Sequence, residues 1–264
     1  MRAAFVTGGS SGIGLAAARQ LAARGHPVAL FARDAARLEA ARQSILEGCA
    51  SARVEIFAVD VRHRDALNRA LQEAMELLGA PGVAIACAGI AIPGLFAEQT
   101  LDQHQLQMEV NYFGALNFVH ALTGPMTEAG GGRIGLIASG AAFFGIYGYS
   151  AYAPSKFALR GLAEVLNVEL APAGIQVTLA YPPDTDTPQL AAEKLTKPPA
   201  TQAITEGGGL WSADAVARDL LQGMEQGRFV VASGVQMKLL NRLTSLIAPL
   251  LRWHQRRIIR RVGR

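Results

Sequence analysis

The sequence predicts a single α/β domain of the Rossmann type, with a doubly wound parallel sheet of about seven strands and helices on both faces. Short apolar runs of strand length alternate with segments of helical periodicity along most of the chain. These runs lack the polar–apolar alternation of half-exposed strands, which is typical of strands buried on both faces. A chain of 264 residues with 50% hydrophobic content is also long enough to bury one large core.

Seven strands are expected, with helices between them. The strands cover Ala3–Thr7, Val28–Ala32, Val54–Val59, Val83–Cys87, Ile134–Ala138, Ile175–Ala180 and Phe229–Ala232. The first three helices cover Ile13–Ala23, Asp34 to about Glu47, and about 65–78. Right-handed crossovers between parallel strands place the ligand crevice at the carboxyl ends of the strands.

Two segments interrupt this alternation. Residues 182–213 contain prolines, threonines and a glycine run, with no clear strand, and an insertion of this length is typical of a lid or binding loop. The second segment is a basic tail from about residue 235. We therefore divide the chain into a main domain, 1–234, which includes the lid, and a tail, 235–264.

The first expected strand leads into a glycine-rich turn. Glycines permit a tight turn and a close approach of backbone to a pyrophosphate, and the following helix offers free N–H groups and its positive dipole end. A glycine cluster alone can be only a loop, but this one lies between a strand and a helix at the start of an α/β domain. The expected pyrophosphate site consists of Gly8, Ser10, Ser11, Gly12, Ile13 and Gly14.

The end of the second strand indicates which dinucleotide binds. An acidic residue there would bond the ribose 2′-hydroxyl of NAD, but neutral Ala32 is followed by Arg33, which can pair with a 2′-phosphate. This favours NADPH. The alternative is a solvated arginine at a helix start capped by Asp34. Asp60, after the third strand, either bonds the adenine amino group or is a turn residue.

Tyr152 and Lys156 lie four residues apart, on one face of an expected helix whose first turn tolerates Pro154. This spacing is common by chance. Ser139 makes it significant, because it ends the fifth strand at the edge where the crevice opens. A phenol beside an ammonium can act as a general acid or base near neutral pH.

These motifs together resemble the short-chain dehydrogenase/reductase family over about residues 3–232. They are TGGSSGIG at 7–14, CAG at 87–89, Asn111, Ser139 and YAPSK at 152–156. The resemblance implies that Tyr152 is the general acid in reduction, that Lys156 lowers the pKa of Tyr152 and bonds the nicotinamide ribose, and that Ser139 orients the ketone oxygen. It further implies that Asn111 holds a water of a proton relay, and that the cofactor site includes Ala88, Gly89, Pro182, Thr185 and Thr187.

The chain departs from the family pattern in two places. Ala86 and Cys87 stand where the family often has two asparagines, so the hydrogen bonds of the second asparagine must be replaced or lost. Pro183 stands where the family usually has glycine. Asp184 and Asp186 in the same loop are interpreted as turn and cap residues.

Longer strings resemble the 3-ketodihydrosphingosine reductases within that family. They are YPPDTDTPQ at 181–189, LTKPP at 195–199, CAGIAIPG at 87–94 and SKFALRGLAE at 155–164. The resemblance implies that NADPH reduces 3-ketosphinganine to sphinganine in sphingolipid biosynthesis. The alternatives are a reductase of another lipid, steroid-like or 3-oxoacyl ketone, and a non-catalytic, NADP-bound membrane adaptor.

The tail predicts an amphipathic helix with basic flanks. Residues 228–264 hold nine lysines and arginines and no acidic residue, whereas the rest of the chain has 16 basic and 21 acidic residues. Its longest uncharged stretch has nine residues, against about 20 needed to span a bilayer. Two apolar sets recur at helical spacing: Met237, Leu240, Leu243 and Ile247, and Leu239, Leu246 and Leu250.

Three interpretations of this tail stand: contact with an anionic membrane surface, packing on the chain itself or on a second subunit, and binding to nucleic acid. Because no aromatic stacking platform accompanies the basic residues, we expect no nucleic-acid partner. Family resemblance implies a homo-oligomer formed near Asn111 and Tyr152. Two cysteines without metal-ligand spacing predict a reducing compartment and no metal site. We expect a cytoplasmic protein, and the tail predicts peripheral contact with the cytoplasmic face of a membrane.

Overall fold

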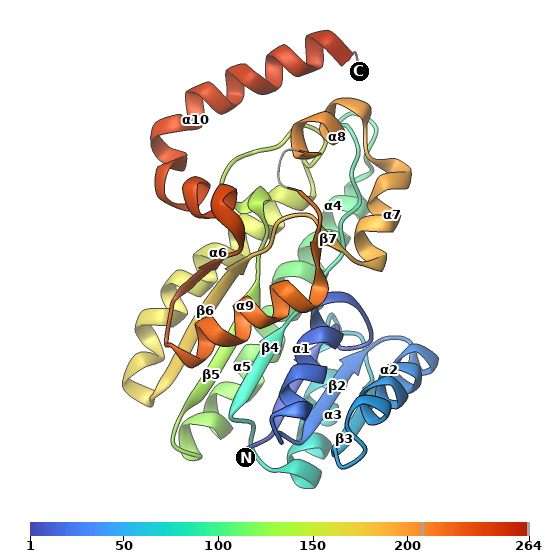
Figure 1. Cartoon of the computed structure of the whole chain (residues 1–264), viewed down its shortest axis with the longest axis vertical. Helices are drawn as coiled ribbons and strands as arrows, with labels where there is room; N and C mark the ends of the chain where they lie inside the picture. The colour runs from blue at the N-terminus through green and yellow to red at the C-terminus, as the bar shows by residue number, and fades with distance from the viewer. Residues whose placement is uncertain (207–208, 263–264) are drawn as a thin grey trace.

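The computed structural model describes residues 1–206 and 209–262. Seven parallel strands form one twisted sheet in the order β3-β2-β1-β4-β5-β6-β9 (Figure 1). Their bounds are β1 Ala4–Thr7, β2 Val28–Ala32, β3 Val54–Ala58, β4 Val83–Ala86, β5 Gly132–Ile137, β6 Ile175–Tyr181 and β9 Val230–Ala232. The order reverses between β1 and β4, and such a switch point opens a crevice at the carboxyl ends of the strands.

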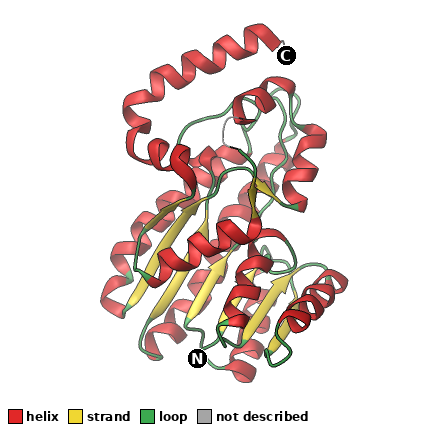
Figure 2. Cartoon of the chain, in the orientation of Figure 1, coloured by secondary structure: helices red, strands yellow, loops and turns green. Residues whose placement is uncertain are grey.

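Helices cover both faces of the sheet (Figure 2). One face packs against α1 (Gly12–Ala23), α2 (Ala35–Gly48) and α9 (Ala213–Glu225), and the other against α3 (Arg64–Leu78), α5 (Gly114–Glu128) and α6 (Tyr152–Glu169). A short helix, α4 (Leu101–Met108), a π-helical turn, η1 (Glu109–Phe113), and two 3-10 turns, η2 (Gly140–Ala142) and η3 (Ala171–Ala173), complete the main domain.

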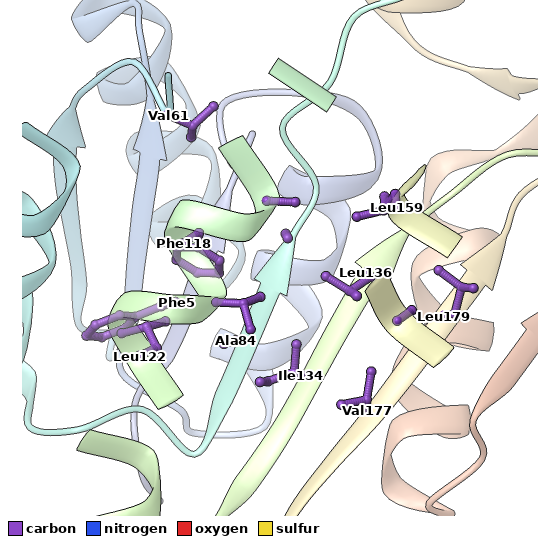
Figure 3. Close-up of a cluster of buried hydrophobic side chains, with 14 of the residues drawn as sticks. Phe5, Val61, Ala84, Phe118, Leu122, Ile134, Leu136, Leu159, Val177 and Leu179 are labelled. Atoms are coloured by element: carbon purple, nitrogen blue, oxygen red, sulfur yellow. The ribbon is translucent and has the colours of Figure 1, made fainter. Parts of the chain in front are cut away.

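The core explains why the strands show no alternation. Successive residues of a strand point to opposite faces, and both faces are covered, so each position needs an apolar side chain. On β1, Phe5 packs against Phe118 and Leu122 of α5, while its neighbour Val6 packs in the cluster on the other face. Figure 3 shows Phe5, Phe118 and Leu122 in the first of these clusters.

The predicted fold class is confirmed, and each expected strand is present with its ends displaced by no more than two residues. The lid segment differs from the prediction of no strand. Two-residue strands β7 (Thr185–Asp186) and β8 (Trp211–Ser212) pair outside the main sheet, and α7 (Pro188–Thr196) and α8 (Pro199–Thr205) lie between them. The pair forms between segments that lie far apart in the sequence, and the Trp211 amide donates to the Asp184 carbonyl at 2.9 Å. No local sequence pattern predicts such a pairing.

The tail forms one long helix, α10 (Gly234–Val262), which changes direction along its length (Figure 1). Pro249 lies inside it, where a proline removes a hydrogen bond and bends a helix. Met237 and Leu240 are buried against the main domain. Near the other end Gln255, only 7% exposed, accepts from the Tyr147 amide at 2.9 Å and donates to the Gly145 carbonyl at 3.0 Å.

One face of α10 therefore packs on the chain itself. Across residues 1–206 and 209–262, no helix combines the length and apolar character that crossing a bilayer requires.

Candidate active site

A cavity of about 660 Å³ opens at the carboxyl ends of the central strands. It brings together every predicted site residue except Gly14 and Asn111, which lie directly behind its wall. The predicted residues that line it are Gly8, Ser10, Ser11, Gly12, Ile13, Arg33, Asp60, Ala88, Gly89, Ser139, Tyr152, Lys156, Pro182, Thr185 and Thr187.

The glycine-rich turn at one end of the cavity has no room for side chains. Gly8 has a φ of 67°, and a Cβ there would lie 2.8 Å from the Ala88 nitrogen. Gly14 supports the turn from behind, since a Cβ would collide with the Gly8 carbonyl oxygen. Ser11, the N-cap of α1, makes no side-chain cap hydrogen bond, so it leaves first-turn amides for a ligand. This cradle fits the pyrophosphate of a dinucleotide.

Thr7, at the end of β1, anchors the backbone that follows β4. Its hydroxyl oxygen accepts from the amides of Cys87 at 3.1 Å and Ala88 at 3.2 Å. The backbone that follows β4 is thereby fixed from β1. Thr7 belongs to the glycine-rich motif, but no contact with this segment was predicted for it from the sequence.

Two arginines, not one, line the cavity beyond β2. Arg33 was predicted, and Arg37 follows it on the first turn of α2. Asp34 caps that helix by accepting from the Arg37 amide at 3.0 Å. Arg33 precedes the cap and lies outside the helix, so no helical spacing linked Arg37 to it in the sequence.

Asp60 lines the same part of the cavity and forms a turn. Its Oδ1 accepts from the Arg62 amide at 3.0 Å, and its Oδ2 accepts from the Arg62 guanidinium at 2.8 Å. Burial raises the pKa of the Asp60 carboxyl, but the hydrogen bonds from Arg62 outweigh burial and the net direction is downward. The turn interpretation of Asp60 therefore has direct structural support.

Ser139, Tyr152 and Lys156 converge at the centre of the cavity. Ser139 lies two residues after β5 and caps η2, where its hydroxyl accepts from the Ala141 amide at 3.2 Å. Tyr152 and Lys156 lie on the first two turns of α6. The Lys156 Nζ donates to the Ile137 carbonyl at 2.9 Å and lies 5.8 Å from the centre of the Tyr152 ring.

Burial is the largest influence on the pKa values of Tyr152 and Lys156. It raises the pKa of Tyr152, the carboxylates of Glu193 and Asp184 raise it further, and the hydrogen-bonding Ser139 side chain lowers it. Burial also lowers the pKa of Lys156 to about 8. The net direction for the pKa of Tyr152 is therefore upward, and the lowering of this pKa by Lys156 stays a prediction.

Asn111 connects two parts of the site from behind. It lies in η1, and irregular helical turns of this kind are frequent at functional sites. Its amide nitrogen donates to the Ile90 carbonyl and to the Ser155 hydroxyl, both at 2.9 Å, and its oxygen accepts from the Ile90 amide at 2.8 Å. Asn111 thus holds the segment after β4 against α6.

The lid brings a second polar group to the cavity, which the sequence did not predict. The Tyr149 hydroxyl donates to Glu193 Oε2 at 3.0 Å, and Lys197 Nζ lies 3.8 Å from the same oxygen. The Tyr149 ring packs against the Tyr152 ring, with 5.2 Å between the ring centroids. Asp184 lines the cavity beside Glu193, and burial raises the pKa of both carboxyls.

Comparison with known proteins identifies the family. The short chain dehydrogenase family model matches residues 2–198. The chain belongs to the short-chain dehydrogenase family. The match covers the glycine turn and all of the converging residues, and α8 to α10 lie beyond it.

Within the short-chain dehydrogenases, the chain is similar to 3-dehydrosphinganine reductase of Danio rerio, with 38% identity over 247 residues, which are 92% of this chain and 74% of the relative. It is 35% identical to 3-ketodihydrosphingosine reductase of Bos taurus over the same shares. A short-chain dehydrogenase from Sphingobium yanoikuyae, solved in complex with NADPH, superposes with a TM-score of 0.80 at 25% identity and 95% coverage of both chains.

Proposed function

We propose that the chain uses NADPH to reduce 3-ketosphinganine to sphinganine, a step of sphingolipid biosynthesis. The observation that carries this proposal is the convergence of Ser139, Tyr152 and Lys156 in the cavity that also contains the glycine cradle. The substrate is inferred from the relatives named as 3-dehydrosphinganine and 3-ketodihydrosphingosine reductases. Apolar residues of the cavity suit a long alkyl chain: Ile90, Ile92, Leu106, Phe144, Ile146, Leu190, Ile204 and Leu240.

Tyr152 delivers the proton in this proposal. A bound nicotinamide would supply hydride to the carbonyl carbon, which leaves negative charge on the carbonyl oxygen. The raised pKa of Tyr152 keeps its phenol protonated at neutral pH, so it can donate to that oxygen. The Ser139 hydroxyl donates a second hydrogen bond to the oxygen and orients the ketone.

Lys156 and Asn111 position the reaction. The Lys156 ammonium, held at the Ile137 carbonyl, would bond the ribose of a bound cofactor. Asn111 fixes the segment after β4 against α6, on which Tyr152 lies. The water relay through Asn111 stays a prediction.

The choice of NADPH rests on the charge beyond β2. Arg33 and Arg37 line the cavity, and the neutral Ala32 ends the strand. Two guanidinium groups favour a 2′-phosphate, whereas a 2′-hydroxyl would gain little from them.

A direct assay tests the substrate. NADPH oxidation is followed with 3-ketosphinganine and, in parallel, with an acetoacetyl thioester and a steroid ketone. We expect turnover with 3-ketosphinganine at the highest kcat/KM of the set. Turnover of the thioester or steroid alone would replace the proposed substrate, and NADPH binding without any turnover would favour a non-catalytic adaptor.

We further propose that α10 contacts an anionic membrane surface, where a long-chain ketone is found. Its outward face carries an apolar stripe at helical spacing, including Leu239, Leu246, Leu250 and Trp253, and Leu246 is 79% exposed. The helix holds seven lysines and arginines and no acidic residue. An exposed apolar stripe flanked by basic residues suits the interface of a bilayer.

Point variants test this contact without disturbing the cavity, which Met237 and Leu240 help to line. Replacing Leu246, Leu250 and Trp253 by serine should abolish sedimentation with phosphatidylserine vesicles. Leu77→Ser, an exposed apolar residue of α3, is the matched control. Unchanged vesicle binding by the triple variant would contradict the interfacial role.

The homo-oligomer is also a proposal. Phe113 of η1 and Phe157, Val165 and Val168 of α6 are exposed apolar residues on elements that pack together. Such a surface suits a second copy of the chain. Light scattering that finds only monomers would contradict it. The cytoplasmic location stays a prediction.

A further inference from the structure

The substrate class proposed above carries a feature that ordinary ketones lack. In 3-ketosphinganine the carbon next to the carbonyl bears an amino group, which is an ammonium when protonated. The ammonium therefore lies close to the carbonyl oxygen that Tyr152 and Ser139 would hold. A cavity built for this substrate needs an anionic group beside those two residues.

The cavity contains such a group on its lid side. Asp184 and Glu193 both line it together with Tyr152 and Ser139. Glu193 accepts a hydrogen bond from Tyr149, whose ring packs against the Tyr152 ring. Lys197 forms an ion pair with Glu193 at 3.8 Å. Burial raises the pKa of Asp184 and the charges of Lys197 and Lys194 lower it, but in residues 1–206 and 209–262 neither lysine forms an ion pair with it.

Glu193 is the structural member of this pair. Its Oε2 accepts from the Tyr149 hydroxyl, and its Oε1 accepts from the side-chain amide of Gln189 at 3.1 Å, so both oxygens have donors. Asp184 differs, because residues 1–206 and 209–262 provide no hydrogen bond or ion pair to its carboxylate. The carboxylate borders the cavity, and its remaining partner must come from a ligand or from water.

The backbone holds Asp184 firmly in place. Pro182 and Pro183 precede it and restrict the chain, and the Thr185 hydroxyl donates to the Pro183 carbonyl at 2.8 Å. The Asp184 carbonyl accepts from the Trp211 amide at 2.9 Å, within the β7–β8 pair. Such a preorganised carboxylate loses little conformational entropy when it binds a ligand.

We propose that Asp184 is a specificity-determining residue that pairs with the ammonium of a long-chain α-aminoketone while Tyr152 and Ser139 hold its carbonyl oxygen. Glu193, with Tyr149 and Lys197, holds the adjoining wall in place. This inference rests on the proposed function and adds to it the group that selects an amino ketone over a plain one.

The experiment compares 3-ketosphinganine with 1-hydroxyoctadecan-3-one, which has the same chain and ketone but no amine. Wild-type kcat/KM should be higher for the amino ketone. Asp184→Asn keeps the size of the side chain, and it should lower kcat/KM for the amino ketone about 10- to 100-fold, mainly through KM. The same variant should change kcat/KM for the desamino ketone by less than about twofold, since no charged hydrogen bond is lost there.

Asp186→Asn is the matched control, because Asp186 is an exposed carboxylate two residues further along. Asp184→Ser is a second variant for the case in which Asp184→Asn does not fold. The comparison of the wild-type kcat/KM values for the two ketones needs no variant. Equal wild-type kcat/KM for both ketones, or an equal loss for both in Asp184→Asn, would overturn the ammonium site and leave the reductase assignment intact. Absence of turnover with both ketones would overturn the proposed function itself.

Discussion

Arg33→Ala is the sharpest test of cofactor choice. Arg33 lines the cavity beyond β2 but its side chain is exposed, so water and salt screen its charge. A hydrogen bond to a charged group contributes about 1.5–3 kcal/mol. The exposed position favours the lower end, about 1.5–2 kcal/mol, which corresponds to roughly a 10- to 30-fold weaker Kd.

The loss should be confined to NADPH. NADH has no 2′-phosphate, so its Kd should change by less than about twofold, and the remaining preference for NADPH should vanish when Arg37 is also replaced by alanine. Fluorescence titration of both cofactors measures this difference. Arg42→Ala is the control, because Arg42 lies on α2, pairs with Glu39 at 3.0 Å and does not line the cavity. Equal weakening of NADPH and NADH by Arg33→Ala would refute the 2′-phosphate contact.

Three more outcomes are expected. Thr7→Val removes the acceptor of two amides after β4, which should cost about 1–3 kcal/mol and lower the Tm in calorimetry; an unchanged Tm would contradict its anchoring role. Because burial lowers the pKa of Lys156 to about 8, its ammonium is lost as pH rises through that value, and kcat/KM should fall above about pH 8. The Lys156→Arg variant should lack this fall. A wild-type kcat/KM that stays constant up to pH 10 would show that the Lys156 ammonium is not needed for the reaction. Gln255→Ala should increase amide hydrogen exchange at the end of α10, by removing its two hydrogen bonds to the loop before α6, and unchanged exchange would mean that these bonds do not hold the helix.

The sheet was predictable because its physical requirement is local. A strand buried on both faces must be apolar at each position, so Val28–Ala32 could be located from its own residues, and its bounds match the structure. The glycine-rich turn and Ser139 follow the same logic, since each comes soon after a strand whose carboxyl end lies at the crevice. Tyr152 and Lys156 lie on α6 and were identified by their spacing of four residues.

The residues that the sequence did not predict depend on distant contacts. Thr7 acts on the backbone after β4, and Glu193 reaches Tyr149 only because α7 folds back over the cavity. Asp184 was interpreted as a turn residue, since nothing near it in sequence shows which carboxylate will border a cavity. In the tail, both apolar sets fit a helix, and only the packed structure shows that Met237 and Leu240 face inward while Leu246 and Leu250 face outward.

Proton donation by the phenol of Tyr152 is tested most directly by Tyr152→Phe, assayed with 3-ketosphinganine and NADPH. The ring and its packing against Tyr149 are retained, so the Kd of NADPH, measured by fluorescence titration, should stay within about twofold. The kcat should fall at least about 100-fold, because no other group in the site is positioned to protonate the ketone oxygen. A variant that binds NADPH normally and turns over at the wild-type rate would show that the proton comes from elsewhere.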